Sequence, residues 1–132
     1  MTTFTKKRIF LVDDNEIDNY INQTIINSLD FASDIVIMTS AHKALNYLIM
    51  CDRESLPDLL FLDINMPAIN GFDFLVEFKK LKQEIIKNII VIILTSSDKE
   101  EDMLEMSKIP IVFSYLVKPL SEDSLILLKK VL

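Results

Sequence analysis

The sequence predicts an α/β fold of the (βα)5 type, in which a parallel five-stranded sheet lies between two layers of helices. Strand-like and helix-like segments alternate five times along the 132 residues. Strict alternation with short connections produces a parallel sheet that is covered by helices on both faces. The segment Ile89–Leu94 is apolar at every position, as a central parallel strand must be. In a doubly wound sheet we expect the strand order 2-1-3-4-5, which leaves the fifth strand at an edge.

Each predicted strand is a short run of large apolar residues, many of them β-branched. The second strand, for example, contains Ile35, Val36 and Ile37 in succession. The five predicted strands are Arg8–Val12, Asp34–Thr39, Leu59–Asp63, Ile89–Leu94 and Val112–Val117.

The predicted helices combine apolar residues at helical spacing with residues that can begin a helix. Ser40 and Ser121 can cap the second and the last helix. The first helix carries its apolar residues three or four positions apart, at Ile17, Tyr20, Ile21, Ile25 and Leu29. The five predicted helices are Glu16–Leu29, Ala41–Met50, Gly71–Lys82, Asp98–Lys108 and a last helix from Ser121 to Leu132.

The chain contains a single glycine, Gly71, although average usage would give about nine in a chain of this length. It follows Asn70 in a turn sequence just before the third helix. We expect a positive φ angle to be the reason for glycine at this position.

Composition and charge fit one globular domain that spans residues 1–132. Half of the residues are apolar and 26% are charged, so we expect a folded rather than a disordered chain. The longest unbroken apolar run has six residues, far too few to span a membrane. The net charge of −6 argues against binding to nucleic acid, which needs a basic surface.

The single cysteine and the single histidine are expected to have no chemical role. Cys51 cannot form an internal disulfide, which fits a reducing compartment, and its apolar neighbours suit a small packing residue. His42 is expected at the surface, at the start of the second helix. The N-terminus runs from basic residues into a strand without the hydrophobic region of a signal peptide. These features together predict a cytoplasmic protein.

Polar and charged side chains stand where the predicted strands end. Asp13 and Asp14 follow the first strand, Asp63 ends the third, Thr95 follows the fourth and Lys118 follows the fifth. Ligands of open parallel sheets bind beyond these carboxyl ends. Converging carboxylates repel one another unless a cation neutralises them, and oxygen ligands at a site open to water and phosphate favour Mg²⁺ over Ca²⁺. The sequence therefore predicts a Mg²⁺-dependent phosphoryl site.

In such a site Asp63 would be the nucleophile and would form an acyl phosphate. Lys118 would pair with Asp63 before phosphoryl transfer and with a phosphoryl oxygen after it, and Thr95 would donate a hydrogen bond to the phosphate. Each residue alone has an ordinary alternative explanation. The acidic pair can simply favour a helix N-terminus, Thr95 can be a turn residue, and Lys118 can be a solvated cation. Their combination at successive strand ends favours the phosphoryl site.

The chain from Arg8 to Leu132 resembles the receiver domains of two-component response regulators. The motifs that carry the resemblance are Leu11-Val12-Asp13-Asp14-Asn15, Leu62-Asp63-Ile64-Asn65-Met66-Pro67, Asn70-Gly71, Leu94-Thr95-Ser96 and Tyr115-Leu116-Val117-Lys118-Pro119. The resemblance implies a flavodoxin-like, three-layer sandwich and a single-domain regulator similar to the chemotaxis regulators.

The resemblance also implies a role for each acidic residue. Asp63 would accept a phosphoryl group from a phosphohistidine of a histidine kinase or a histidine phosphotransfer protein. Mg²⁺ would be bound by the side chains of Asp14 and Asp63 and by the backbone carbonyl of Asn65, and Asp13 would act mostly through water. The domain would take part in its own phosphorylation and autodephosphorylation without being an enzyme.

Phosphorylation is expected to change a protein-binding surface. The resemblance implies that Thr95 and Tyr115 form a switch pair, in which the hydroxyl moves toward the phosphate and the aromatic ring moves inward. Ser96 is small, which would leave room for the donor histidine. The sequence departs from the family at Ile111-Val112-Phe113, where small residues are common.

The output surface is expected around the fourth helix, the fifth strand and the fifth helix. Alternation along a strand places Phe113 and Tyr115 on one face. Met103, Met106 and Phe113 could there form a surface for a downstream protein or for a phosphorylation-dependent homodimer. The alternative is that Phe113 points inward and that the methionines fill gaps in the core.

Three alternatives to a stand-alone phosphorylated receiver remain open. The chain could be a receiver domain excised from a longer regulator, or a receiver-like scaffold that is not phosphorylated. It could also be an aspartyl-phosphate hydrolase of the haloacid dehalogenase type. That class needs a second Asp two residues after the nucleophile, where this chain has Asn65.

Overall fold

The computed structural model describes residues 5–66, 70–96 and 100–132. Pro67 of the predicted turn and Asp98 at the predicted start of the fourth helix lie outside the described residues. Five parallel strands form one sheet in the order β2-β1-β3-β4-β5. This order confirms the predicted fold class and the edge position of the fifth strand. The strands are β1 (Lys7–Val12), β2 (Ala32–Met38), β3 (Leu59–Asp63), β4 (Ile90–Thr95) and β5 (Val112–Val117).

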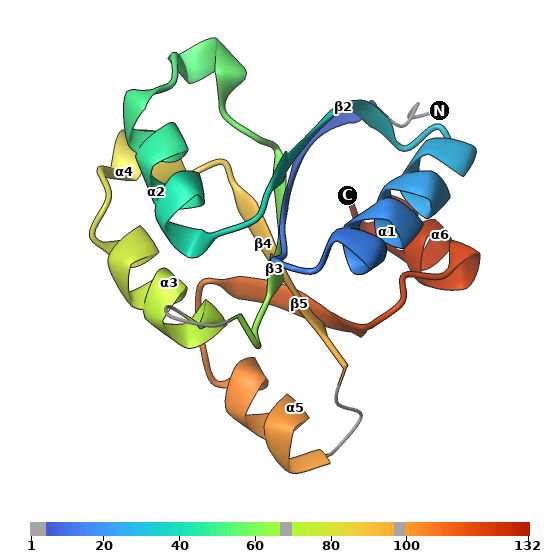
Figure 1. Cartoon of the computed structure of the whole chain (residues 1–132). Helices are drawn as coiled ribbons and strands as arrows, with labels where there is room; N and C mark the ends of the chain where they lie inside the picture. Colours follow the sequence, from blue (N-terminus) through green and yellow to red (C-terminus); the bar gives the residue numbers. More distant parts are fainter. Residues whose placement is uncertain (1–4, 67–69, 97–99) are drawn as a thin grey trace.

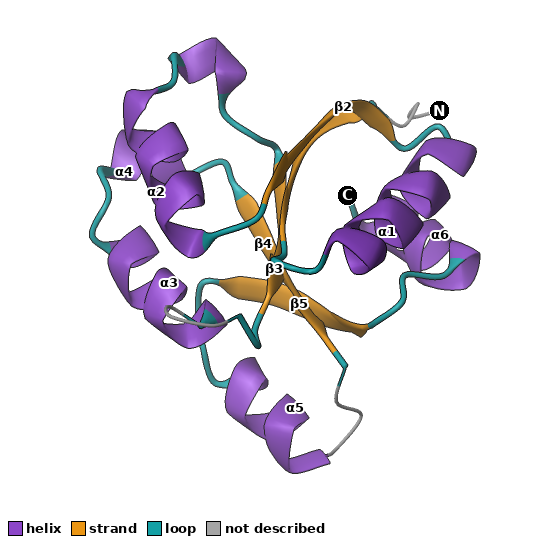
Figure 2. Cartoon of the chain, viewed as in Figure 1, coloured by secondary structure: helices purple, strands orange, loops and turns teal. Residues whose placement is uncertain are grey.

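Helices cover both faces of this sheet (Figure 1), and their layers can be followed in Figure 2. One face carries α1 and α6, and the other carries α2, α3, α4 and α5. The helices are α1 (Glu16–Ser28), α2 (Ala41–Met50), α3 (Gly71–Lys79), α4 (Gln83–Ile86), α5 (Glu100–Ser107) and α6 (Glu122–Val131), with a short 3₁₀ helix η1 (Arg53–Ser55). None of the helices in the described part of the chain is long and apolar enough to cross a membrane.

The predicted helix caps are confirmed, but the third helix ends at Lys79 instead of Lys82, and a short helix that was not predicted follows it. Ser40 accepts a hydrogen bond from the backbone N–H of Lys43, and Ser121 forms a reciprocal cap with Ser124. After Lys79 the chain leaves the helical path, because the N–H of Leu81 bonds back to Phe78 and closes the last turn. A separate turn, α4, then brings Ile86 into the core.

The core consists of two apolar clusters, one on each face of the sheet. Alternate residues of β1 enter different clusters: Ile9 and Leu11 pack with α1 and α6, whereas Phe10 and Val12 pack on the opposite face. All five residues of β3 are buried, as expected for a central strand. The sheet therefore fixes the positions of the strand ends.

The first helix, α1, is rotated about its own axis relative to the orientation that its apolar spacing suggests. Its buried residues are Asn19, Asn22 and Ile26, whereas Ile17 and Tyr20 are each 71% exposed. Each of the two buried asparagines bonds to backbone through one of its two amide atoms. Asn19 Nδ2 donates to the carbonyl of Asp13, at 2.8 Å, and Asn22 Oδ1 accepts from the N–H of Leu120, at 3.1 Å.

The predicted positive φ at Gly71 is wrong, since no described glycine has one. Glycine is needed here because of a close approach between two backbone segments. A Cβ atom at Gly71 would lie 2.6 Å from the Cα of Ile64 and 3.2 Å from the carbonyl oxygen of Asp63. The N–H of Gly71 also donates to the carbonyl of Ile64, at 2.9 Å. The first turn of α3 is thus packed directly against the chain that follows Asp63.

The predicted shared face of Phe113 and Tyr115 is also wrong. The register between β4 and β5 shifts at this point, so that Val91 pairs with Val112 but Ile92 pairs with Ser114. Phe113 is therefore left in an irregularity of the strand, which interrupts the alternation of side chains. Tyr115 packs against the cluster beneath α2 to α5, whereas Phe113 lines a groove beside α6.

Met106 is likewise a core residue, because it is only 1% exposed and belongs to the same cluster as Tyr115. This contradicts its predicted place in an exposed partner surface. Met103 is half-buried, and His42 is exposed as predicted. Cys51 is half-buried near the end of α2, and burial raises the pKa of its thiol.

Candidate functional site

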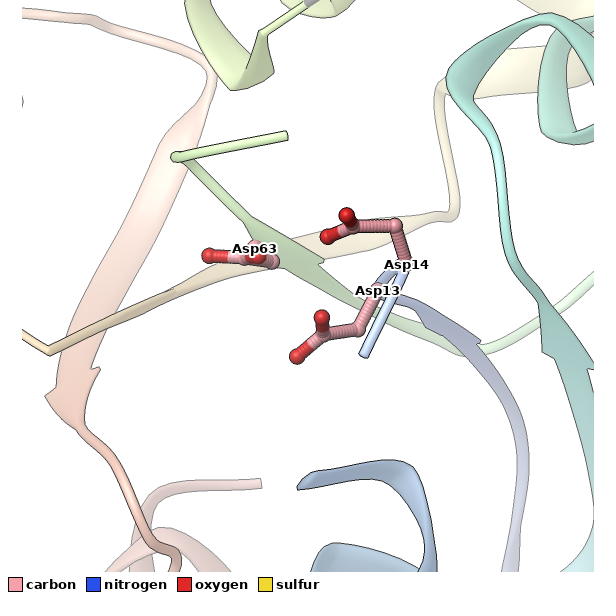
Figure 3. A group of neighbouring side chains, drawn as sticks. All are labelled: Asp13, Asp14 and Asp63. Atoms are coloured by element: carbon pink, nitrogen blue, oxygen red, sulfur yellow. The ribbon is translucent and has the colours of Figure 1, made fainter. Parts of the chain in front are cut away.

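The parallel sheet brings the predicted site residues together at one edge. Asp13 and Asp14 directly follow β1, Asp63 is the last residue of β3, Thr95 ends β4, and Lys118 directly follows β5. Because the carboxyl ends of parallel strands meet at the same edge, these side chains converge although they are far apart in sequence. Figure 3 shows the three carboxylates at the ends of their strands.

The three aspartates form a compact acidic cluster. One carboxylate oxygen from each of Asp13, Asp14 and Asp63 lies within 4.8 Å of the others. Asp13 and Asp63 are buried, at 0% and 3% exposed, whereas Asp14 is exposed. Local turns orient the two buried carboxylates: Asp13 accepts a hydrogen bond from the N–H of Asn15, at 2.9 Å, and Asp63 accepts one from the N–H of Asn65, at 3.2 Å.

Lys118 points its ammonium group into this cluster. Its Nζ lies 2.8 Å from Asp18 Oδ2, 3.1 Å from Asp13 Oδ2 and 3.6 Å from Asp63 Oδ1. The lysine side chain is only 12% exposed. Its backbone N–H donates to the carbonyl of Thr95 at 2.7 Å, which ties the end of β5 to the end of β4.

Burial and the neighbouring charges shift the pKa values of two groups. Burial raises the pKa of Asp63 to about 6, and the charge of Asp13 adds to this, while the N–H of Asn65 and the Lys118 ammonium oppose it. Burial alone would lower the pKa of Lys118. The hydrogen bonds with Asp18 and Asp13 and the charge of Asp63 outweigh burial, so the pKa of Lys118 is raised and the side chain stays a cation.

The residues of the cluster fit a divalent cation with oxygen ligands. The single positive charge of Lys118 is shared by three carboxylates, and Asp14 adds a fourth carboxylate to the same region. Burial, with a smaller contribution from the charge of Asp13, raises the pKa of Asp63, so a further cation near its carboxylate would favour the charged form. A hard ion such as Mg²⁺ would be held by carboxylate oxygens and would keep positions for water and phosphate.

The other predicted residues lie around the cluster. Thr95 is 1% exposed at the end of β4, next to Leu94, which pairs with Asp63. Asn65 and Ser96 are exposed beside the site, and Tyr115 is half-buried two residues before Val117, the partner of Thr95.

Sequence reasoning missed three residues of α1 that contact the site or its supports: Asp18, Asn19 and Asn22. A signal for them was present, since they follow Asp13 on a helix that begins at the site. Three- and four-residue spacing of apolar positions pointed instead to Ile17, Tyr20 and Ile21, which leaves the polar residues on the opposite side. Only the observed hydrogen bonds show that the polar side faces inward.

Comparisons with known proteins agree with this geometry. The family model described as the response regulator receiver domain matches residues 9–129. A probable methanogenesis regulatory protein, FilR2 of Methanothrix harundinacea, is 32% identical over 119 residues, which cover 89% of this chain and 75% of that protein.

Solved structures of response regulators share the fold. A two-component response regulator from Cytophaga hutchinsonii is 32% identical with a TM-score of 0.84, and the match covers 96% of each chain. The phosphorylated cyanobacterial phytochrome response regulator RcpA is 28% identical with a TM-score of 0.71, and the match covers 96% of this chain and 90% of that one. The acidic cluster of Asp13, Asp14 and Asp63 fits the phosphorylation and Mg²⁺ site of such domains. This chain belongs to the response regulator receiver family of two-component signalling.

Proposed function

We propose that this protein is a phosphorylation-switched receiver that accepts a phosphoryl group on Asp63. The main support for the proposal is the environment of the Asp63 side chain. Its buried carboxylate lies 3.6 Å from the Lys118 ammonium and within 4.8 Å of oxygens of Asp13 and Asp14. An ionised carboxylate held beside a fixed cation and a cation-binding acidic pair can attack phosphorus and form an acyl phosphate.

In this reaction a carboxylate oxygen of Asp63 forms a bond to phosphorus while the bond from phosphorus to the donor nitrogen breaks. Asp14, Asp63 and the backbone carbonyl of Asn65 would hold Mg²⁺ directly, with Asp13 acting through water. The bound ion would neutralise charge on the phosphoryl oxygens. Lys118 would pair with one phosphoryl oxygen, and the Thr95 hydroxyl would donate a hydrogen bond to another.

The direct test is phosphorylation by acetyl phosphate, followed by intact-mass measurement. We expect one phosphoryl group per chain with Mg²⁺ and none after chelation with EDTA. Beryllium fluoride with Mg²⁺ should shift the NMR signals of Thr95 and Tyr115, the proposed switch pair. A protein that binds Mg²⁺ but neither reacts with acetyl phosphate nor responds to beryllium fluoride would be a binding scaffold instead.

We propose that hydrolysis of the acyl phosphate is a property of the same site and not of a separate catalytic apparatus. A haloacid dehalogenase-type hydrolase would need an acid two residues after Asp63, and Asn65 cannot supply a proton in that role. Loss of the phosphoryl group should therefore be slow and first order, and it should not depend on protein concentration. The cytoplasmic location and the existence as a single domain stay predictions.

The exposed side of α1 supports a surface for the phosphohistidine donor. Ile17 and Tyr20 are each 71% exposed, and they flank Asp18, whose carboxylate reaches Lys118. Apolar side chains at the rim of a phosphoryl site can pack against a partner helix while the donor histidine approaches Asp63. Ser96 on the other side of the site is small and exposed.

Substitution of Ile17 or Tyr20 by Ser should slow phosphoryl transfer from a phosphorylated histidine phosphotransfer domain by about tenfold. Phosphorylation by acetyl phosphate should remain normal, because the small donor does not contact α1. Ile49→Ser is the matched control, since Ile49 is 55% exposed on α2, on the other face of the sheet. Equal transfer rates in all variants would place the donor elsewhere.

The output surface is proposed on α5, β5 and α6, without Met106. Exposed apolar residues on these elements are Leu104, Phe113, Val117, Ile126, Leu127 and Val131. Phe113, Leu127 and Val131 line a groove of about 270 Å³ between β5 and α6. Tyr115 on the same strand would couple the surface to Thr95, because it pairs with Ile93 two residues before Thr95. A partner must bind the two states unequally for phosphorylation to act through this surface.

Phe113→Ser tests this surface. Phe113 is 50% exposed in an irregular part of the strand, so we expect a folded protein with normal phosphorylation and weaker self-association or partner binding. Self-association is measured by analytical ultracentrifugation with and without beryllium fluoride. Phe72→Ser is a control of similar exposure on α3, at 40%. If Phe113→Ser unfolds the protein, Phe113 is structural and the surface is misplaced.

A further inference from the structure

The closest ion-pair partner of Lys118 is Asp18, which is neither the proposed phosphoryl acceptor nor a member of the acidic cluster. The distance from Lys118 Nζ is 2.8 Å to Asp18 Oδ2, but 3.6 Å to Asp63 Oδ1. The Asp18 side chain is 34% exposed and that of Lys118 is 12% exposed, so water screens the contact only in part. The ammonium group is thus closer to Asp18 on α1 than to the acceptor, although it stays within ion-pair distance of Asp63.

The position of Asp18 is fixed by several hydrogen bonds around it. Asn15 caps α1 and accepts from the backbone N–H of Asp18, at 3.0 Å. One residue later, buried Asn19 bonds to the carbonyl of Asp13, at 2.8 Å. Asn22 binds the N–H of Leu120, at 3.1 Å, in the segment that carries Lys118. Hydrogen bonds therefore connect the start of α1 to the end of β1 and to the chain beyond β5. The Asp18–Lys118 ion pair lies between these two connections.

We propose that Asp18 is a positioning residue that retains Lys118 in the unphosphorylated protein and lowers the affinity of the site for a phosphoryl group. The inference rests on the proposed function, in which Lys118 pairs with a phosphoryl oxygen on Asp63. A phosphoryl oxygen would compete with Asp18 for this ammonium, and the weakened Asp18–Lys118 ion pair opposes binding. The negative charge of Asp18 also repels the anionic phosphoryl group. Both effects lower the affinity of the site for a phosphoryl group.

Beryllium fluoride, used at saturating Mg²⁺, measures this effect without phosphoryl transfer. Asp18→Asn keeps the size of the side chain but removes its charge. Because partly exposed ion pairs are weak, we expect binding to Asp63 to become tighter by about two- to fivefold. The ¹⁹F signal of the fluorine beside Lys118 should also shift, which a general loss of stability would not cause. Asp18→Glu should restore the wild-type affinity, and Asp18→Ser should repeat the gain of Asp18→Asn.

Glu16→Gln is the matched control, because Glu16 is an acidic residue in the same first turn of α1. No ion pair joins it to Lys118 in the described part of the chain, and its removal should leave the affinity unchanged. An equal gain in Glu16→Gln, or no gain in Asp18→Asn and Asp18→Ser, would overturn the positioning role. Failure of the wild-type protein to bind beryllium fluoride at Asp63 would instead overturn the proposed function.

Discussion

Asp63→Asn is expected to abolish phosphorylation by acetyl phosphate. The amide of asparagine is a poor nucleophile and cannot form an acyl phosphate, and the neighbouring Asp13 is held by Lys118 and the Asn15 N–H. The variant should fold, because Asn can still accept the hydrogen bond that the Asn65 N–H donates to Asp63. Intact mass after incubation with Mg²⁺ and acetyl phosphate should show one phosphoryl group in the wild type and none in the variant.

Asp58→Asn provides the control, at the opposite end of β3 from Asp63. Asp58 directly precedes β3 at the opposite edge of the sheet, where its carboxylate accepts a hydrogen bond from the N–H of Arg8, at 2.9 Å. The loss of one carboxylate there should leave phosphorylation at the wild-type level. If Asp63→Asn is still phosphorylated at the wild-type rate, another side chain is the acceptor and the proposed function is wrong.

The sequence predicted the site better than its surroundings, for a physical reason. Buried apolar strands are unmistakable in β3 and β4, and parallel strands bring their carboxyl ends to one edge. The positions of Asp13, Asp63, Thr95 and Lys118 along the chain were therefore enough to predict that they converge. Neither exact strand bounds nor side-chain contacts were needed for that conclusion.

The failures concern rotation and close contact, which periodicity does not determine. Apolar spacing along α1 suggested that Ile17 faces inward, but Asn19 and Asn22 occupy the interior, where they bond to the backbone of Asp13 and Leu120. The irregularity at Phe113 breaks the alternation on which the predicted shared face with Tyr115 depended. At Gly71, a positive φ angle was expected, but glycine is needed because its backbone lies close to that of Ile64. Such features depend on how distant segments pack.

The raised pKa of Asp63 predicts that the Mg²⁺-free protein loses stability as pH rises from about 4 to 6. In the folded state Asp63 keeps its proton up to a pKa of about 6, whereas in the unfolded state it releases the proton near the ordinary pKa of 3.8 for this side chain. Between these values the folded state holds more protons, so rising pH favours unfolding. The stabilisation is fully present below pH 3.8 and is lost as pH rises through 6.

One pKa unit corresponds to about 1.4 kcal/mol, so the complete effect on the free energy of unfolding is at most about 3 kcal/mol. Asp63→Asn removes the charge that must be buried at neutral pH. In EDTA at pH 7 it should therefore raise the Tm by about 5–10 °C. The control Asp58→Asn alters an exposed carboxylate and should shift the Tm little.

Mg²⁺ should raise the Tm of the wild-type protein at pH 7 by mass action, because the ion binds the folded state. The increase should be much smaller in Asp63→Asn, which lacks one of the proposed ligands. Melting curves at pH 4, 5, 6 and 7, with EDTA or Mg²⁺, separate these effects, and the difference between wild type and Asp63→Asn removes the contribution of other carboxylates. If the Tm difference between Asp63→Asn and the wild type does not grow between pH 4 and 6, ionisation of Asp63 costs the folded protein little stability. The charge of Lys118 would then compensate the buried carboxylates, and repulsion within the cluster could not be the reason for binding Mg²⁺.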